Sequence, residues 1–348
     1  MRRLIEMGVL LLFTACSDKY YSIDDFSKVK KIDAHIHLRT EEPDLIDIAI
    51  KYNFKLITIN TESTNPSSQE VIALSLAKKY PELIYYLGYF PTDSINNNGW
   101  ADSTISVIKK NIRNGTLGIK IWKNIGMEIK NRDGKYIMAD NPVFDKVFSY
   151  MTSEKIPLMS HLGEPKYCWQ PLGKMVFGRN YYKKNPQYHM YNHPECPNYT
   201  MQIEAMERLL EKNPDLIYIG AHLASLEWSV DELANRLDRF PNMCVDVSAR
   251  IECLQLQTRD NREKVRDFFI RYSDRIIYGS DFVVNEGMDD SFYKYCNDTW
   301  LSDWEFFVSD NRMENPDIKG FFNGLKLPKD VIDHIYFKNA YKLLLKKN

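Results

Sequence analysis

The chain lacks several features that would place it in a well-defined class of protein. It has no apolar run of about 18 residues or more, so no segment is expected to span a membrane as a helix. It has no run of lysine and arginine interleaved with aromatic residues, and its formal net charge is −1, so nucleic acid is not expected as a partner. Its six cysteines include no Cys-x-x-Cys pair, which argues against a structural zinc cluster or a disulfide framework.

The N-terminus carries the features of an export signal. Two arginines give a basic start, residues 7–13 form a short apolar run, and small residues precede Cys16. This pattern resembles a bacterial lipoprotein signal, in which cleavage before the cysteine leaves its thiol carrying a lipid. We expect a signal peptide in 1–16 and a tether in 17–30, and we expect a protein exported to the bacterial cell envelope and anchored through lipid on Cys16. The alternative is an ordinary apolar helix.

From residue 31 onwards, short runs rich in β-branched and aromatic residues alternate with longer segments of helical periodicity. Proline ends several of these segments, as at Pro81, Pro214 and Pro241, because it cannot continue a helix. Eight strand–helix units over about 250 residues are typical of an α/β protein built as a single (β/α)8 TIM barrel, which we expect over residues 31–348. The predicted strands are 32–38, 56–60, 83–90, 117–122, 156–161, 216–222, 243–248 and 276–281.

Ionisable side chains lie at the ends of four of these strands. His35 and His37 belong to the first strand, and His161, His222 and Asp281 end the fifth, sixth and eighth. Because the carboxyl ends of barrel strands meet at one face, these side chains are expected to converge there. Imidazoles and a carboxylate are ligands that suit a divalent metal and its activated water. The sequence therefore predicts a metal-dependent enzyme.

Strict alternation along the first strand predicts which of its residues face inward. Residues two apart share a face of a strand, so the two histidines point together and Asp33 lies beneath them. The alternate residues Ile32, Ala34 and Ile36 are then expected to face the surrounding helices.

The same count, applied to the fourth strand, predicts substrate-binding residues. Lys120 and Trp122 point inward. Lys123 and Arg250, near the ends of strands four and seven, are candidates for binding a substrate carboxylate, with exposed loop charges as the alternative. The aromatic-rich excursions after strands five and eight, residues 162–200 and 282–323, are expected to form the pocket wall.

Each polar residue also has a simpler explanation when it is considered alone. His161 could be a core histidine, and Asp281 could be a helix N-cap. Lys120 could be a buried cation paired with Asp33 or Asp246. The joint pattern favours a metal site, because burying this many polar groups without partners would cost several kcal/mol each.

Taken in order, the residues that carry this chemistry resemble the amidohydrolase superfamily: Asp33, His35, His37, His161, His222, Ser280 and Asp281. The likeness is greatest to the branch that includes aminocarboxymuconate-semialdehyde decarboxylase and related amidohydrolases. The resemblance implies that His222 is left free as an acid/base or polarising group. The chemistry of the residues agrees, since Asp281 can take a proton from a metal-bound water. The resemblance also implies that four residues hold one divalent ion, with zinc as the expected metal: His35, His37, His161 and Asp281.

Lys120 leaves a two-metal arrangement open. In binuclear members of the superfamily, a carboxylated lysine at the end of strand four bridges two ions, and the histidines of strands five and six hold the second. This chain has a residue for each of those roles. A single ion with an uncarboxylated Lys120 is the preferred interpretation.

Three functions are compatible with these patterns. The leading interpretation is a metal-dependent hydrolase that attacks an amide, ester or lactone of a small molecule. The second keeps the metal and makes the protein a carbon–carbon lyase that decarboxylates a small carboxylated substrate. The third is a surface lipoprotein that binds a ligand without catalysis, and such a role would not need His222 and Asp281 together beside a metal. The patterns carry no signal for an oligomeric state.

Overall fold

The computed structural model describes residues 19–61 and 68–346. The predicted signal peptide, with its lipid attachment site Cys16, lies outside the described residues. In the described part of the chain, no helix combines the length and the apolar character that crossing a bilayer requires. The segment just before the first strand lies against the barrel, where Phe26 is buried and Lys31 Nζ donates to the main-chain carbonyl of Val29 at 2.7 Å.

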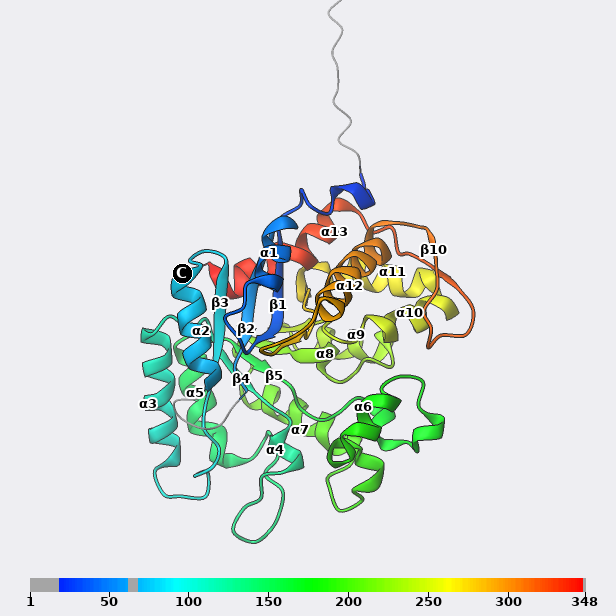
Figure 1. Cartoon of the computed structure of the whole chain (residues 1–348). Coiled ribbons are helices and arrows are strands. Elements are labelled where there is room, and N and C mark those ends of the chain that lie inside the picture. The colour runs from blue at the N-terminus through cyan, green and yellow to red at the C-terminus, as the bar shows by residue number, and fades with distance from the viewer. Residues whose placement is uncertain (1–18, 62–67, 347–348) are drawn as a thin grey trace, which may run out of the picture.

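The main sheet is a parallel barrel surrounded by helices (Figure 1). Each strand from β1 to β8 pairs with the next, and β9, which follows β8, pairs with the free side of β1. A main-chain hydrogen bond from Ala34 N to Tyr278 O, at 3.0 Å, helps to close the barrel. The predicted (β/α)8 barrel is confirmed. Its strands are β1 (Lys31–Leu38), β2 (Phe54–Ile59), β3 (Ile84–Tyr89), β4 (Ile119–Ile121), β5 (Leu158–Ser160), β6 (Tyr218–Gly220), β7 (Met243–Asp246), β8 (Ile276–Ile277) and β9 (Val283–Val284).

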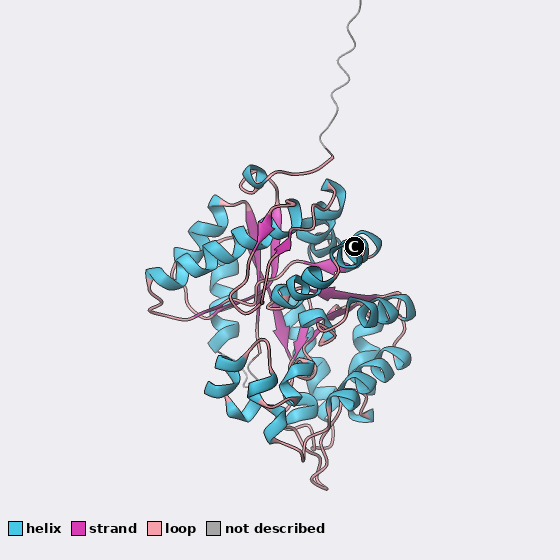
Figure 2. Cartoon of the chain, turned by 90° about the vertical axis from the view of Figure 1, so that its right-hand side faces the viewer, coloured by secondary structure: helices cyan, strands magenta, loops and turns pink. Residues whose placement is uncertain are grey.

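Helices form the outer layer around the strands (Figure 2). A small hairpin of β10 (Arg312–Met313) and β11 (Phe322–Asn323) lies outside the barrel sheet, and two π-helical turns, His334–Lys338 and Tyr341–Leu345, follow the last α-helix. The helices are α1 (Asp44–Lys51), α2 (Ser68–Lys79), α3 (Trp100–Arg113), α4 (Asn124–Met127), α5 (Asp145–Ser153), α6 (Arg179–Lys184), α7 (Tyr199–Lys212), α8 (Ala221–Ala224), α9 (Val230–Arg239), α10 (Ile251–Asp260), α11 (Arg262–Arg271), α12 (Asp290–Val308) and α13 (Lys329–Asp333).

The interior of the barrel is filled by apolar side chains from most of its strands. Ala340 and Leu344, in the C-terminal segment, pack against the same cluster. This packing leaves the polar residues of the strands to gather at the opposite, carboxyl end. The strand residues of the cluster include Ile32, Ala34, Ile57, Ile59, Leu87, Met159, Ile219, Cys244 and Ile277.

An irregularity in β1 reverses the predicted orientation of its first half. The pairing of β1 with β2 shifts register between Asp33 and Ile36, as at a β-bulge. Ile32 and Ala34 therefore pack in the barrel interior, whereas Asp33 accepts a hydrogen bond from Trp300 Nε1 on α12 at 3.1 Å. The expectation that Ile32 and Ala34 face the helices, with Asp33 beneath the histidines, is wrong because strict alternation does not allow for a bulge. Beyond it, the two histidines still point into the barrel mouth.

Helix α12 carries a buried carboxyl group against the end of β8. Asp303 accepts a hydrogen bond from the hydroxyl of Tyr278 at 2.8 Å. Burial raises the pKa of Asp303 from 3.8 to about 8, because the charged form loses its hydration. The folded chain therefore binds this proton more tightly than the unfolded chain does. The stability that this proton contributes is complete below pH 3.8 and is lost as the pH rises through about 8.

Replacing Asp303 with asparagine is expected to remove part of this pH dependence, because the amide stays neutral. The melting temperature of the variant should fall less than that of the parent chain between pH 5 and pH 9, in thermal unfolding followed by circular dichroism. Asp290→Asn, at the exposed start of the same helix, is the control. If the melting temperatures of the parent chain and of Asp303→Asn fell equally over this pH range, the prediction would be contradicted.

Candidate metal centre

One pocket at the carboxyl ends of the strands gathers the residues that the sequence singled out for chemistry. Its volume is about 360 Å³, which suits a small molecule. The excursion after β5 contributes Glu164, Tyr167, Tyr181 and Tyr182 to the wall, as expected of segment 162–200. All of the described residues predicted to bind metal, transfer a proton or bind substrate line this pocket: His35, His37, Lys120, Trp122, Lys123, His161, His222, Arg250 and Asp281.

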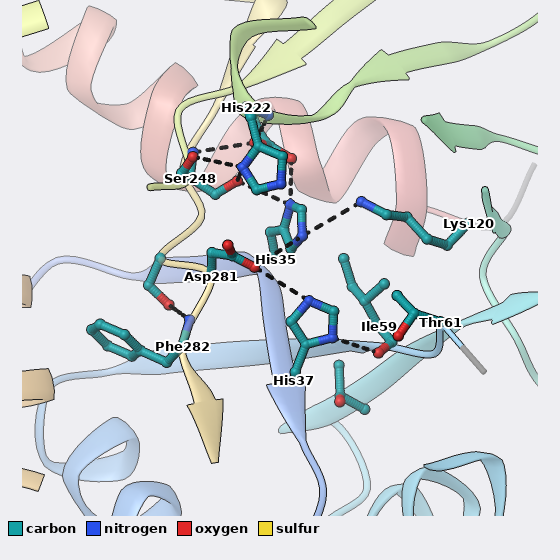
Figure 3. A network of polar contacts seen from close by, with 12 residues as sticks. His35, His37, Ile59, Thr61, Lys120, His222, Ser248, Asp281 and Phe282 are labelled. Carbon is teal, nitrogen blue, oxygen red and sulfur yellow. Dashed lines mark hydrogen bonds and ion pairs between the residues drawn. The ribbon is translucent and has the colours of Figure 1, made fainter. Parts of the chain in front are cut away.

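The two histidines of β1 turn the same ring nitrogen toward Asp281 (Figure 3). His35 Nδ1 lies 2.8 Å from Asp246 Oδ2, and His37 Nδ1 lies 3.0 Å from the main-chain oxygen of Ile59. A carboxylate and a carbonyl accept hydrogen bonds, so Nδ1 carries a hydrogen in both rings, and Nε2 is the nitrogen that holds the lone pair whenever the ring is neutral. The two Nε2 atoms lie 3.4 and 3.2 Å from one oxygen, Asp281 Oδ1.

This arrangement directs three acceptor atoms at one another. Two lone pairs and a carboxylate oxygen repel unless a cation lies among them. Imidazole nitrogens and carboxylate oxygens are the usual ligands of zinc and related divalent ions. The donor set therefore fits a divalent metal.

The histidines that follow β5 and β6 complete the cluster. His222 Nδ1 lies 2.9 Å from the main-chain oxygen of Ser248, which leaves its Nε2 free as well. Ligand atoms of His35, His222 and Asp281 all lie within 4.8 Å of one another. The ring of His161 lies 4.3 Å from that of His222, and His161 Nε2 is buried without a hydrogen-bond partner among the described residues. The group whose ligand atoms lie within 4.8 Å of one another contains His222 and two of the predicted ligands, His35 and Asp281, but neither His37 nor His161.

Burial sets the charge state of these groups. It lowers the pKa of His35, which the charge of Lys120 lowers further, and it lowers the pKa of His161 and His222 well below that of a free histidine. The three imidazoles are therefore neutral at pH 7, as metal ligands must be. Burial opposes ionisation of Asp281, but the surrounding imidazoles, His222 first, hold the pKa of its carboxyl well below the ordinary value.

His222 reaches the pocket through a strained backbone turn. Strand β6 ends at Gly220, earlier than predicted, because residues 222–225 all adopt left-handed φ angles between 54° and 57°. None of them is glycine, and such a conformation costs about 1–2 kcal/mol per residue. Asp246 Oδ1 holds the turn by accepting from His222 N at 2.8 Å, and Ser225 Oγ donates to the main-chain oxygen of Leu162 at 3.0 Å.

Gly220→Ala is expected to disturb this turn. The added Cβ would lie 2.5 Å from Ala224 Cβ, so the turn has to move. We expect a loss of about 1–3 kcal/mol in the free energy of unfolding, measured by urea denaturation, together with lower activity. Gly173→Ala is the control, because no described atom lies within 4 Å of its new Cβ. Equal stability of the two variants would contradict the strained geometry.

Lys120 projects from β4 to the same centre, as predicted. Its Nζ lies 3.5 Å from His35 Nε2 (Figure 3). Burial lowers the pKa of this amine to about 8, against the opposing charges of Asp246 and Asp281. Part of the lysine is therefore unprotonated near neutral pH, and the unprotonated amine is the form that reacts with carbon dioxide. This position suits either of the roles predicted for Lys120, a cation that binds substrate or a carboxylated bridging ligand.

Lys123 and Arg250 differ in how their charges are satisfied. Lys123 forms a buried ion pair with Glu164, which also accepts from the hydroxyl of Tyr182 at 2.7 Å. Arg250 Nη1 donates to the main-chain oxygen of Ala249 at 2.6 Å, and its Nε is buried without a hydrogen-bond partner in the described part of the chain. Arg250 therefore lines the pocket without an ion-pair partner among the described residues, whereas Glu164 already neutralises Lys123.

Sequence reasoning missed the residues that support the centre. The patterns point to Asp246 only as a partner of Lys120, yet it binds His35 and the main chain of His222. The position of Asp246, a carboxylate at the end of the apolar run of β7, could have indicated that it supports the centre. Glu164 gave no comparable signal, because it lies in a long loop whose path the pattern does not predict.

Comparison with known proteins identifies the family. An amidohydrolase family model matches residues 99–345, more than half of the chain. The chain therefore belongs to the amidohydrolase family, and members of that superfamily are enzymes. The predicted superfamily is confirmed. No curated protein has a matching sequence.

Solved structures show the same fold at low sequence identity. An uncharacterized TIM-barrel protein from Bordetella bronchiseptica is 13% identical over 90% of this chain and 98% of its own, with a TM-score of 0.52. A 2,6-dihydroxybenzoate decarboxylase, complexed with 2,6-dihydroxybenzoate, is 12% identical over 90% and 98%, with a TM-score of 0.50. A putative amidohydrolase from Staphylococcus aureus is 13% identical over 91% and 100%, with a TM-score of 0.50.

Proposed function

We propose that this protein is a metal-dependent hydrolase that cleaves an amide, ester or lactone of a small molecule. The observation that carries the proposal is the group of acceptor atoms around Asp281 Oδ1, which two imidazoles face at 3.2 and 3.4 Å. A divalent cation would relieve the repulsion among these acceptor atoms, and the pocket also holds a further imidazole, that of His222.

The ligands proposed for a single divalent ion, expected to be zinc, are His35, His37, His161 and Asp281. Support comes from the Nε2 lone pairs of the two β1 histidines and from the unpartnered Nε2 of His161 within the described residues. When bound, such an ion supplies a Lewis acid that lowers the pKa of a coordinated water and polarises a carbonyl group.

The protein's own groups move the proton during hydrolysis. Asp281 is an ionised carboxylate and accepts a proton from the attacking water. His222 is neutral at rest with a free Nε2, and it lies within 4.8 Å of Asp281, so it takes up the proton and delivers it to the leaving group. A neutral His222 cannot donate through Nε2 before it is protonated, which favours proton delivery over stabilisation of an oxyanion in the ground state.

Arg250 is proposed to bind a substrate carboxylate, with Trp122 as part of the pocket wall. Arg250→Gln should raise KM for anionic substrates by about 10-fold to 100-fold, the effect of a lost charge-assisted hydrogen bond, with a smaller change in kcat. Steady-state kinetics on anionic and neutral substrates of matched shape measure the difference. The control is Arg259→Gln on the outer helix α10, and an equal rise in KM for both kinds of substrate would contradict the assignment.

A second candidate is a metal-dependent decarboxylase of a small carboxylated substrate. Arg250 favours it, since a guanidinium that lines the pocket can hold the carboxylate of such a substrate. The decarboxylase among the solved structures has the same fold, which supports the fold and not the reaction.

Two measurements test the proposal together. Elemental analysis of the purified protein should find about one divalent ion per chain, and its removal by chelation should abolish activity. A panel of amides, esters, lactones and carboxylated aromatics is then assayed for incorporation of labelled water and for release of carbon dioxide. Release of carbon dioxide without hydrolysis would contradict the hydrolase proposal and support the decarboxylase.

Two further expectations stay proposals. In the binuclear alternative, a metal titration would bind two equivalents, and Lys120→Ala would lose one of them. A lipid on Cys16, with export to the cell envelope, would be detected by metabolic labelling with palmitate and would be lost in Cys16→Ser.

A further inference from the structure

A second cavity adjoins the first on the far side of Asp281. Its volume is about 310 Å³, and no residue of the proposed reaction except Asp281 lines it. The two cavities share Ala249, Glu252, Asp281 and Val283 in their walls, so they meet at the carboxylate that is proposed to accept the proton. We call the second cavity the side chamber.

Aromatic and aliphatic side chains line much of the side chamber, together with Ser280, Thr299 and the carboxyl groups of Glu252, Asp281 and Asp303. Helix α12 contributes Phe292, Tyr295 and Thr299, and other segments contribute Ile251 and Phe282. The rings of Phe282 and Tyr295 meet edge to face at 5.9 Å, and the ring of Tyr295 lies 6.5 Å from that of Phe292. Rings in such tilted contacts offer both edges and faces to an added aromatic group.

The charge in the side chamber also suits a neutral occupant. Asp303 lines the chamber and is largely uncharged at neutral pH, because burial raises the pKa of its carboxyl to about 8. Burial raises the pKa of Glu252, in the shared wall, as well. Arg250, whose Nε has no hydrogen-bond partner among the residues that the structure describes, lines the first cavity instead. The two cavities therefore differ in chemistry, one for an anion and the other for an uncharged apolar group.

We propose that the side chamber binds the aryl leaving group of a two-part substrate, whose acyl part carries a carboxylate held in the first cavity by Arg250. This inference rests on the proposed hydrolase function and narrows its substrate class. The reacting carbonyl lies between the two cavities, beside Asp281. Water forms the new carbon–oxygen bond, the bond to the aryl alcohol or amine breaks, and the proton passed through Asp281 and His222 goes to the departing oxygen or nitrogen.

Binding of p-cresol, a neutral aryl alcohol, tests the chamber directly by isothermal titration calorimetry on the metal-loaded protein. Thr299→Trp fills the chamber from α12 and is expected to weaken p-cresol binding by about tenfold or more, because the probe loses its apolar surroundings. Tyr295→Ala removes one wall at a position that is already 58% exposed, and it should weaken binding without threatening the fold. Asp298→Trp, one residue earlier and exposed, is the control.

Kinetics with monophenyl and monomethyl succinate separate the two proposals. Thr299→Trp should lower kcat/KM for the phenyl ester by about tenfold relative to the methyl ester. If neither these esters nor any amide, ester or lactone of the panel is hydrolysed but p-cresol binding follows the variants, the hydrolase proposal fails and the aryl site stands. Absence of saturable p-cresol binding, or binding that Thr299→Trp and Tyr295→Ala leave unchanged, overturns the chamber, and so does an equal loss of kcat/KM for both esters.

Discussion

Replacing Asp281 with asparagine is expected to lower kcat by about 10³-fold, because one substitution removes both a proposed metal ligand and the proposed proton acceptor. Asparagine keeps the shape of the side chain and loses the charge that faces the Nε2 atoms of His35 and His37 at 3.4 and 3.2 Å. The measurement is kcat with a substrate found in the panel, combined with the metal content of the purified variant by mass spectrometry.

The paired readout distinguishes the two roles of Asp281. A variant that retains full metal content and still loses kcat has lost the proton acceptor, whereas loss of both indicates a ligand. Asp317→Asn, an exposed carboxylate outside the pocket, is the control for handling and metal loading. Retention of kcat within about tenfold at full metal content would remove Asp281 from the reaction, since loss of a general base usually costs more.

The sequence predicted the barrel because its strand–helix alternation is repeated and local. The prediction for Lys120 is correct because β4 is regular, so its neighbours Ile119 and Ile121 face outward and the lysine faces inward. The prediction for Ile32 and Ala34 is wrong because the irregularity in β1 moves the residues that precede it to the opposite face of the strand. Local patterns therefore predict a strand more securely than they predict which face each residue occupies.

For the candidate site too, the sequence predicted what depends on local patterns and not what depends on contacts between distant residues. Each ionisable residue at a strand end was visible in the sequence, and the barrel topology brings such ends together. The state of each group depends on partners far away in sequence. Asp246 fixes the tautomer of His35 across 211 positions, and Glu164 neutralises Lys123 across 41. No alternation or spacing encodes those contacts, and none indicates that Lys123 forms an ion pair whereas Arg250 forms none with the described residues.

Glu164→Gln is expected to be among the most destabilising substitutions in the pocket wall. Lys123 and Glu164 expose only 4% and 3% of their side chains, so removal of the carboxylate leaves a buried ammonium group without its counter-charge. Breaking such a pair costs about 3–5 kcal/mol in the free energy of unfolding. Urea denaturation measures the loss, and Asp231→Asn, which breaks an exposed pair with Lys264, should cost less than about 1 kcal/mol.

A double variant shows whether the uncompensated charge is the cause. Lys123→Met combined with Glu164→Gln removes both charges and keeps most of the volume of both side chains, so it should recover much of the stability that Glu164→Gln loses. Tyr182 can still donate to the amide oxygen of the glutamine, which keeps this hydrogen bond nearly constant through the series. If the double variant were less stable than Glu164→Gln, the main cause of the loss would be the packing of the lysine over the ring of Tyr188, at 3.8 Å, rather than the buried charge.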